Sequence, residues 1–278
     1  MSVYLNDIPL PEARSRLEQA LKKAGRWGLL AVEEIPLDEH ALGRVLAEPV
    51  WARISSPHYH ASAMDGFAVR SADTSGAMPS APVTLDYGAR VTYMDTGDPL
   101  PAWADAIIPI ENVESLSTQG QPAADPRRPE KIRIRAAITP WSHVRSLGED
   151  IVATQLVLPG GQILRPVDLG AIAACGHETV RVARRPRVAI LPTGTELVRI
   201  GQPVRPGDII EYNSLVLAAQ VSAWGGEAVR YPITTDNFEL IQERVRQAAQ
   251  DFDLILLNAG SSAGSEDFSS RVVESLGT

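Results

Sequence analysis

The chain has 278 residues, 44% of them hydrophobic and 22% charged, so it can bury the core of a globular protein and is long enough for two or three domains. Its net charge of −8 excludes a nucleic-acid binder that works through bulk positive charge, although local amides and a few cations can still hold a small anion. The single cysteine, Cys175, rules out an internal disulfide framework and a cysteine-based zinc site, and without a signal peptide or a membrane-length apolar run we expect a cytoplasmic protein.

The first fifty residues are predicted to form two helices around a short strand. Apolar residues recur at helical spacing over 11–24, and Gly25 is a typical helix end. The apolar run 29–35 predicts a strand. Residues 38–47 predict a second short helix, which Pro49 terminates.

From Trp51 to about residue 165, short β-like runs alternate with turns rich in glycine and proline, which is typical of a small β module. The polar segment 118–131 is expected to be a loop at the tip of this module. A short helix is predicted over 168–175. The predicted strands cover residues 67–70, 83–87, 106–110, 131–138 and 155–158.

The last part of the chain alternates buried-type strands with helices, an order that predicts a parallel α/β layer. We expect Asn213 to cap the first of these helices, and Asp236 or Asn237 to cap the second. The strands are predicted at 188–191, 228–231 and 254–257, and the helices at 214–224, at 238–249 and from Asp267 to about residue 276.

Two loops follow strands of this layer, where ligands bind in open parallel sheets. The first is 192–196. The second, 258–267, is small, rich in hydroxyl groups and leads into a helix N-terminus, so it can expose backbone amides to an anion. A phosphate cradle and a plain structural loop are both compatible with this composition.

Three acids, Glu196, Asp236 and Asp267, each follow a predicted strand of the same sheet and should therefore lie along one edge. The two aspartates could instead be ordinary helix caps. Three carboxylates beside an anion cradle would repel the anion unless a divalent cation joined them, and Mg²⁺ favours such a mixture of carboxylate, water and phosphate oxygens. A magnesium site is the resulting hypothesis.

A fourth acid, Asp65, precedes Gly66 at the start of the strand over 67–70. Asp-Gly is turn chemistry, so a hairpin turn and a positioned carboxylate are both open interpretations. The rigid turn over 94–101 and the charged turn over 145–150 are, by themselves, ordinary ordered loops.

Five segments together resemble one family. They are residues 62–70 (SAMDGFAVR), 96–101 (TGDPLP) followed by 104–106, 148–151 (GEDI), 185–189 leading to 193–197 (TGTEL), and the loop 260–267. One such motif would be weak evidence, but five in order identify the chain as similar to the molybdopterin molybdenumtransferase (MoeA) family, which is related to the gephyrin E domain.

The resemblance implies a multi-domain fold: an elongated β-containing domain, a small β domain inserted into it, and a MogA-like α/β/α parallel-sheet domain that is incomplete here. The implied segments are 1–50 for the N-terminal helices and the first part of the elongated domain, 51–148 for the inserted domain, 149–184 for the second part of the elongated domain, and 185–278 for the MogA-like molybdopterin-binding domain.

The resemblance also implies an activity in molybdenum cofactor biosynthesis, the insertion of molybdenum from molybdate into adenylylated molybdopterin with Mg²⁺ and release of AMP. The family works as a homodimer and can receive its substrate from a MogA-type adenylyltransferase. By resemblance, the catalytic residues are Asp65, Thr96, Asp150 and Glu196, the substrate-binding residues are Thr193, Gly194, Gly260, Ser261, Ser262, Gly264 and Ser265, and the metal ligands are Glu196, Asp236 and Asp267.

The chain departs from the family pattern in three places. The cradle loop begins Ala259-Gly260 where the family has two glycines, Asp98 stands where a small residue is common, and the C-terminal part of the family is missing. A non-catalytic module that binds molybdopterin or a nucleotide, or a dimerising scaffold, is therefore the alternative interpretation. The choice between molybdenum and tungsten is also open.

Overall fold

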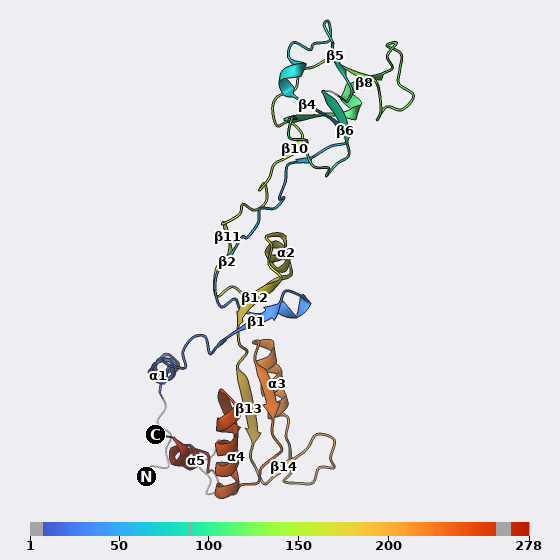
Figure 1. Ribbon diagram of the computed structural model, residues 1–278. Helices are drawn as coiled ribbons and strands as arrows, with labels where there is room; N and C mark the ends of the chain where they lie inside the picture. Colours follow the sequence, from blue (N-terminus) through green and yellow to red (C-terminus); the bar gives the residue numbers. More distant parts are fainter. Residues whose placement is uncertain (1–7, 89, 260–267, 278) are drawn as a thin grey trace. The chain divides into compact units, whose positions relative to one another are not determined.

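The computed structural model describes residues 8–88, 90–259 and 268–277 (Figure 1). The chain divides into two compact units. One comprises Met1–Ile35, Gly43–Ala47 and Arg181–Thr278, and the other comprises Pro36–Leu42 and Glu48–Val180. Among the helices in the described ranges, none is both long and apolar enough to cross a membrane.

The second unit is built mainly from short antiparallel strands. Two three-stranded sheets, in the orders β6-β4-β7 and β5-β9-β8, form its β module. The unit also contains the two-stranded pairs β3 with β10 and β2 with β11. The strands are β2 (Val50–Trp51), β3 (Ala61–Ser62), β4 (Gly66–Val69), β5 (Val83–Asp86), β6 (Val91–Met94), β7 (Ala106–Pro109), β8 (Val113–Leu116), β9 (Lys131–Ile134), β10 (Val144–Arg145) and β11 (Leu156–Leu158).

One hydrophobic core joins the two three-stranded sheets of the β module. Phe67 on β4, Leu85 on β5 and Ile132 on β9 all belong to it, and Phe67 also makes edge contacts with the ring of Tyr93 at a centroid distance of 5.5 Å. Every residue of β4 is buried. Because burial on both faces fixes its position, β4 is a rigid support for Asp65, the residue that precedes it.

The same unit contains the α-helix α2 (Pro166–Ala174) and the 3₁₀ turns η1 (Glu39–Ala41), η2 (Ser71–Thr74) and η3 (Ile110–Asn112). Pro166 occupies the first turn of α2, where its missing N–H costs nothing. Asp168, which is 3% exposed, accepts hydrogen bonds from the backbone and guanidinium of Arg165. The pKa of the Asp168 carboxyl is lowered, chiefly because the Arg165 side chain donates a hydrogen bond to its charged form. These contacts fix the start of α2.

The first unit contains a three-stranded parallel sheet in the order β16-β13-β17. Two further pairs accompany it, β1 with β12 and the parallel pair β14 with β15. The elements are α1 (Leu10–Lys23), β1 (Val32–Pro36), β12 (Thr179–Ala183), β13 (Arg187–Pro192), β14 (Leu197–Val198), β15 (Ile209–Ile210), α3 (Asn213–Ala223), β16 (Glu227–Arg230), α4 (Phe238–Asp251), β17 (Leu254–Asn258) and α5 (Ser269–Leu276).

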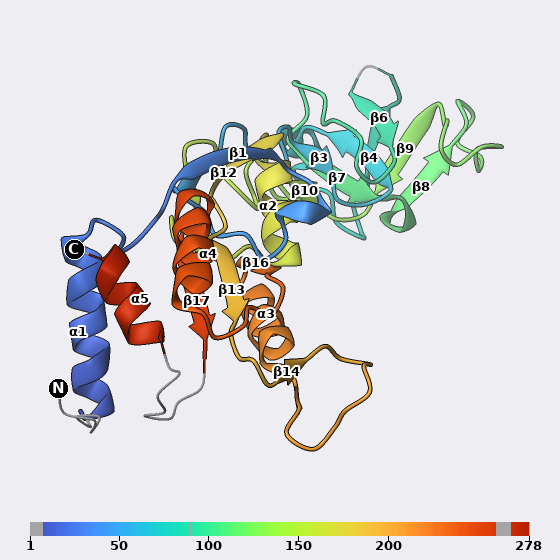
Figure 2. The ribbon, with the colours of Figure 1, turned by 90° about the horizontal axis from the view of Figure 1, so that it is seen from below.

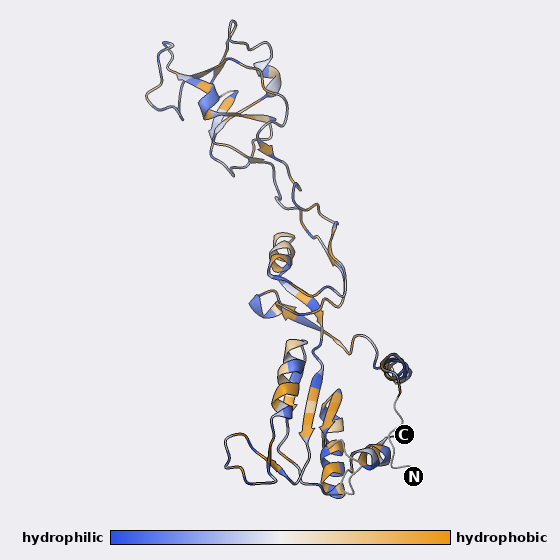
Figure 3. Cartoon of the chain, turned by 180° about the vertical axis from the view of Figure 1, so that it is seen from behind, coloured by the Kyte–Doolittle hydropathy of each residue, from blue (hydrophilic) through white to orange (hydrophobic). Residues whose placement is uncertain are grey.

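The central strand β13 is apolar along most of its length because both of its faces are covered (Figure 3). Val188 and Ile190 pack against Val221 of α3, whereas Ala189 and Leu191 pack against Ala248 of α4. Figures 1 and 2 accordingly show α3 and α4 on opposite sides of β13. The predicted parallel α/β layer is confirmed.

Two local predictions are wrong. Residues 38–47 do not form a helix, because Gly43 adopts a φ of +73° and the chain then pairs with the β12 region through Leu46 and Val182. Asn213 does not cap α3 but is its first residue. The carboxylate of Glu211 accepts the backbone N–H of Ser214 instead, at 2.7 Å.

Candidate functional site

The carboxyl ends of the three parallel strands are joined by backbone hydrogen bonds. The N–H of Thr193, directly after β13, donates to the carbonyl of Asn258 at the end of β17, at 2.9 Å. On the other side, Gly194 donates to the carbonyl of Thr234 at 3.0 Å, and Thr234 donates to that of Pro192 at 2.9 Å. The loops that follow β13 and β16 therefore start from one connected edge of the sheet.

Asp236 joins two of these loops through its side chain. Its Oδ2 atom accepts hydrogen bonds from the backbone N–H of Thr195 at 3.0 Å and from the Thr195 hydroxyl at 3.3 Å. The cap of α4 is Asn237, whose side chain accepts the N–H of Leu240 at 2.9 Å. Of the two predicted caps, Asn237 is thus the residue that caps α4, and the Asp236 carboxylate faces the strand-end loops.

Glu196 lies over the backbone of Gly194. A Cβ atom added at Gly194 would come within 2.9 and 3.0 Å of the two carboxylate oxygens of Glu196 and within 2.8 Å of Leu197 Cγ. Gly194 also has a φ of +154°, which residues with a side chain rarely adopt. Glycine at this position therefore allows the Glu196 carboxylate to lie directly over the end of β13.

The chemistry of these groups fits a hard divalent cation such as Mg²⁺. Within the ranges that the structure describes, neither Glu196 nor Asp236 forms an ion pair, so both carboxylates keep oxygens available. The hydroxyl of Thr234, a residue 4% exposed, has no hydrogen-bond partner there either. A group bound at this edge would find free acidic oxygens.

The remaining predicted residues of this edge lie outside the described residues. They are Gly260, Ser261, Ser262, Gly264, Ser265 and Asp267. In the part of the chain that is described, no three His, Cys, Asp or Glu side chains are grouped closely enough to hold a metal ion. The three-carboxylate site stays a prediction.

Asp65 is held by Thr96, 31 positions further along the chain. Both the N–H and the hydroxyl of Thr96 donate to Asp65 Oδ1, each at 2.8 Å. These two bonds lower the pKa of the Asp65 carboxyl because they stabilise its charged form, and the bond from the Thr96 backbone has the larger effect. The carboxylate is exposed, and its position is fixed by residues outside its own turn.

The Asp65-Gly66 corner is not a hairpin turn. β4, which starts at Gly66, pairs with β6 and β7, whereas the preceding strand β3 pairs with β10. A Cβ atom at Gly66 would lie 2.2 Å from the carbonyl oxygen of Ile108, so only glycine permits this strand spacing. Of the two open interpretations, the geometry favours the positioned carboxylate.

Asp150 lies in a charged turn of the same unit as Asp65. Its Oδ2 atom accepts a hydrogen bond from the Arg145 guanidinium at 2.9 Å, and Glu149 approaches the same guanidinium at 3.9 Å. All three side chains are about half exposed. The structure shows the ion pair expected of such a turn, and a role for Asp150 in chemistry stays a prediction.

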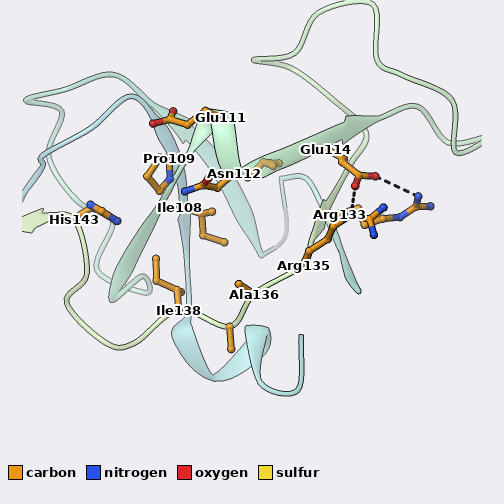
Figure 4. Close-up of a pocket in the computed structure, with 12 residues that line it drawn as sticks. Ile108, Pro109, Glu111, Asn112, Glu114, Arg133, Arg135, Ala136, Ile138 and His143 are labelled. Carbon is orange, nitrogen blue, oxygen red and sulfur yellow. Dashed lines mark hydrogen bonds and ion pairs between the residues drawn. The ribbon is translucent and has the colours of Figure 1, made fainter. Parts of the chain in front are cut away.

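The β module contains a separate pocket of about 530 Å³, and none of the predicted site residues lines it (Figure 4). Its charged groups neutralise one another, since Glu114 pairs with both Arg133 and Arg135. These arginines, with the Arg135 side chain foremost, lower the pKa of Glu114. A pocket whose cations are already paired has little excess charge with which to attract an anion.

One residue that the sequence did not single out is Thr195, which ties Asp236 to the loop after β13. Its position could have indicated a role in the site, because Thr195 is a hydroxyl residue between Gly194 and Glu196, shortly after a buried strand. Thr234 was also missed, because its burial depends on the pairing of β16 with β13 and not on its own neighbours in the sequence.

The architecture and the strand-end acids agree with comparisons to known proteins. The pattern described as "MoeA N-terminal region (domain I and II)" matches residues 8–176, and that described as "Probable molybdopterin binding domain" matches residues 189–278. The chain therefore belongs to the MoeA family, with a MogA-like domain at its C-terminal end, as its motifs predicted.

Individual relatives extend this result. The chain is 37% identical over 245 residues to "Molybdopterin molybdenumtransferase 2" of Mycobacterium tuberculosis, covering 83% of this chain and 57% of that protein. It is 31% identical over 252 residues to "Molybdopterin molybdenumtransferase" of Nostoc sp., covering 85% of this chain and 55% of that protein.

A crystal structure of a "molybdopterin biosynthesis moea protein" from Pyrococcus horikoshii matches with a TM-score of 0.78 at 29% identity, covering 94% of this chain and 66% of that one. This match and the family patterns confirm the predicted fold class. The chain spans little more than half the length of the curated relatives it matches.

Proposed function

We propose that this protein takes part in molybdenum cofactor biosynthesis as a molybdopterin molybdenumtransferase. It would insert molybdenum from molybdate into adenylylated molybdopterin, with Mg²⁺, and release AMP. Membership of the MoeA family and the printed names of the two curated relatives support the class of reaction. The magnesium requirement and the release of AMP are further steps of the proposal.

The observation that carries it is the sheet edge where Glu196 and Asp236 stand on adjoining loops without cationic partners among the described residues. Two unpaired carboxylates next to a sheet edge repel an anionic substrate. They become favourable for one only when a divalent cation is held between them and the substrate oxygens. A polyanionic, phosphate-bearing substrate with Mg²⁺ matches this arrangement.

Each residue of the edge has a distinct part in this proposal. Glu196 and Asp236, with Asp267, would hold Mg²⁺, and Thr195 keeps the Asp236 carboxylate oriented by donating two hydrogen bonds to one of its oxygens. Mg²⁺ held by these carboxylates would offset the phosphate charge while an oxygen of molybdate or water attacks the adenylyl phosphorus and the phosphoanhydride bond breaks, which leaves AMP and the pterin phosphate. The loop 260–267 would cradle the anion through its amides and serines. No protein nucleophile is required.

The carboxylates of the other unit serve the same reaction in this proposal. Asp65 keeps its charge over a wide pH range because Thr96 lowers its pKa, so it can act as a fixed negative group. Asp150 is the second carboxylate that this unit contributes in the proposal. The proposed partners are a second copy of the chain, as a homodimer, and a MogA-type adenylyltransferase that supplies the substrate.

The test is the release of AMP from adenylylated molybdopterin, assayed with this chain and with a version extended to the full length of its relatives. Release by the extended protein should require both molybdate and Mg²⁺ and should be lost in Glu196→Gln. The control Glu239→Gln removes the same charge from the exposed first turn of α4 and should keep full activity. Absence of release from the extended protein would refute the proposal.

A further inference from the structure

A second pocket, of about 450 Å³, lies in the unit that contains the parallel sheet. Its wall includes Pro232 and Ile233, which follow β16 and lead directly to Thr234 and Asp236. It therefore lies at the same carboxyl edge of the sheet as the candidate site. Its polar lining comes from Arg199, Arg230 and Glu211.

Arg230 is held in a fixed orientation in this pocket. Its Nε donates to the hydroxyl of Ser214 at 2.8 Å, and its guanidinium lies 3.7 Å from the carboxylate of Glu211. Glu211 is 6% exposed and accepts both the N–H and the hydroxyl of Ser214, at 2.7 and 2.6 Å. The buried carboxylate thus fixes Ser214, which fixes Arg230, while the arginine side chain stays 39% exposed to solvent.

Arg199 supplies a second guanidinium that is not neutralised. Its backbone N–H and carbonyl both form hydrogen bonds with Gln202, whereas within the described ranges its guanidinium forms no ion pair or hydrogen bond. With one carboxylate and two guanidinium groups, the pocket has an excess of one positive charge. In the pocket of the β module, by contrast, Glu114 pairs with both arginines.

We propose that this pocket binds a phosphate group of the substrate, with Arg199 and Arg230 as donors and with Glu211 and Ser214 positioning Arg230. Guanidinium groups present planar pairs of N–H donors that match the oxygens of a phosphate. The pocket is lined by residues that end and follow β16, and Asp236 comes after them in the same loop, so a phosphate here would lie at the sheet edge that bears this proposed metal ligand. This inference rests on the proposed function, whose substrate carries phosphates.

The test is calorimetric titration of the intact chain with AMP, with inorganic phosphate and with molybdate as separate ligands. We expect Arg199→Gln and Arg230→Gln to weaken binding of AMP or phosphate about tenfold, the loss expected for a charge-assisted hydrogen bond. The matched control is Arg205→Gln, which removes the same charge from the same β14–β15 connection but lies outside the pocket lining, and should change affinity by less than about twofold.

Comparing the ligands shows which kind of phosphate compound the pocket binds. Weakened AMP binding assigns the pocket to the nucleotide, and weakened binding of inorganic phosphate alone assigns it to another phosphate ester; both results support the proposal. Equal affinities of the wild type and Arg199→Gln, no binding by the wild type, or an effect confined to molybdate would overturn it. Because Arg230→Gln also removes a partner of buried Glu211, Arg199→Gln is the decisive variant.

The same titration distinguishes this inference from the proposed function. Arginine-dependent phosphate binding without molybdate-dependent AMP release by the extended protein would refute the transferase activity and leave the phosphate pocket in place. Molybdate-dependent AMP release with no arginine dependence of binding would refute only the pocket.

Discussion

Replacing Gly194 by alanine should both destabilise the parallel sheet and displace the carboxylate of Glu196. The new Cβ would lie 2.8 Å from Leu197 Cγ and 2.9 and 3.0 Å from the two Glu196 oxygens, closer than real Cβ contacts. The Glu196 side chain can rotate away, whereas Leu197 is half-buried at the start of β14 and has less freedom to move.

The expected cost has two parts. A residue with a side chain at a φ of +154° costs about 1–3 kcal/mol in backbone strain, and the crowding against Leu197 adds about 1–3 kcal/mol of overpacking. The control is Gly201→Ala, where φ is +86° and nothing lies within 4 Å of the added Cβ, so only the backbone cost of about 1–2 kcal/mol applies. The difference between the variants reports the crowding at Gly194 together with any difference in backbone strain between the two φ values.

The assay is equilibrium unfolding in urea followed by circular dichroism, combined with native-state hydrogen exchange at the amides of β13. Gly194→Ala should lose more stability than Gly201→Ala and should speed exchange at β13. Equal losses in the two variants would refute the conclusion that Gly194 is required for the close approach of Glu196 and Leu197 to the end of β13.

Three further predictions concern single contacts. Asp253→Asn removes the carboxylate that accepts two hydrogen bonds from Arg184, at 2.9 and 2.7 Å, and should cost about 1–2 kcal/mol in urea unfolding at pH 7. Because Arg184 lowers the pKa of folded Asp253, this stabilisation is present above the unfolded pKa and should disappear as the pH falls through the folded pKa. A difference in unfolding free energy between the wild type and Asp253→Asn that persists at low pH would contradict this reasoning. Thr96→Val removes one of two donors and should raise the pKa of Asp65 toward its ordinary value in carbon-13 NMR titration, and an unchanged pKa would show that the backbone bond suffices. Gly66→Ala places a Cβ 2.2 Å from a carbonyl oxygen of β7 and should destabilise the β module by more than about 3 kcal/mol, measured by near-ultraviolet circular dichroism, and a native-like spectrum and melting curve would refute it.

The parallel α/β layer was predictable from sequence because its signals are strong and local. The strand over 188–191 is a continuous apolar run, as strands buried on both faces require, and α4 has an amphipathic repeat preceded by a capping asparagine. The short strands β6 and β8 were not predicted, although the equally short β4, β5 and β7 were. Their pairing depends on partners far along the chain.

The helix predicted over 38–47 failed for a similar reason. Its apolar residues have helical spacing, but Gly43 takes a left-handed conformation and Leu46 is buried in a bridge to Val182. Tertiary pairing across more than a hundred positions outweighed the local propensity, which is a weak bias of under about 1 kcal/mol per residue.

In the candidate site, likewise, some features could be predicted from the sequence and others could not. That Glu196 and Asp236 follow strands of one parallel sheet could be worked out from element order, since parallel strands end at the same edge. The link through Thr195 and the pairing of Arg230 with Ser214 could not, because both are contacts between side chains on different elements. The phosphate pocket accordingly emerged from the structure alone.

The most direct test of the account is to measure how much molybdenum becomes bound to the pterin for each AMP released by the extended protein. Elemental analysis of the purified pterin product and chromatography of AMP give the two amounts. We expect equal molar amounts that rise together with molybdate concentration and fall together in Glu196→Gln. Release of AMP without incorporation of molybdenum would contradict the account, because the protein would then be a hydrolase of the adenylylated pterin and not a molybdenumtransferase.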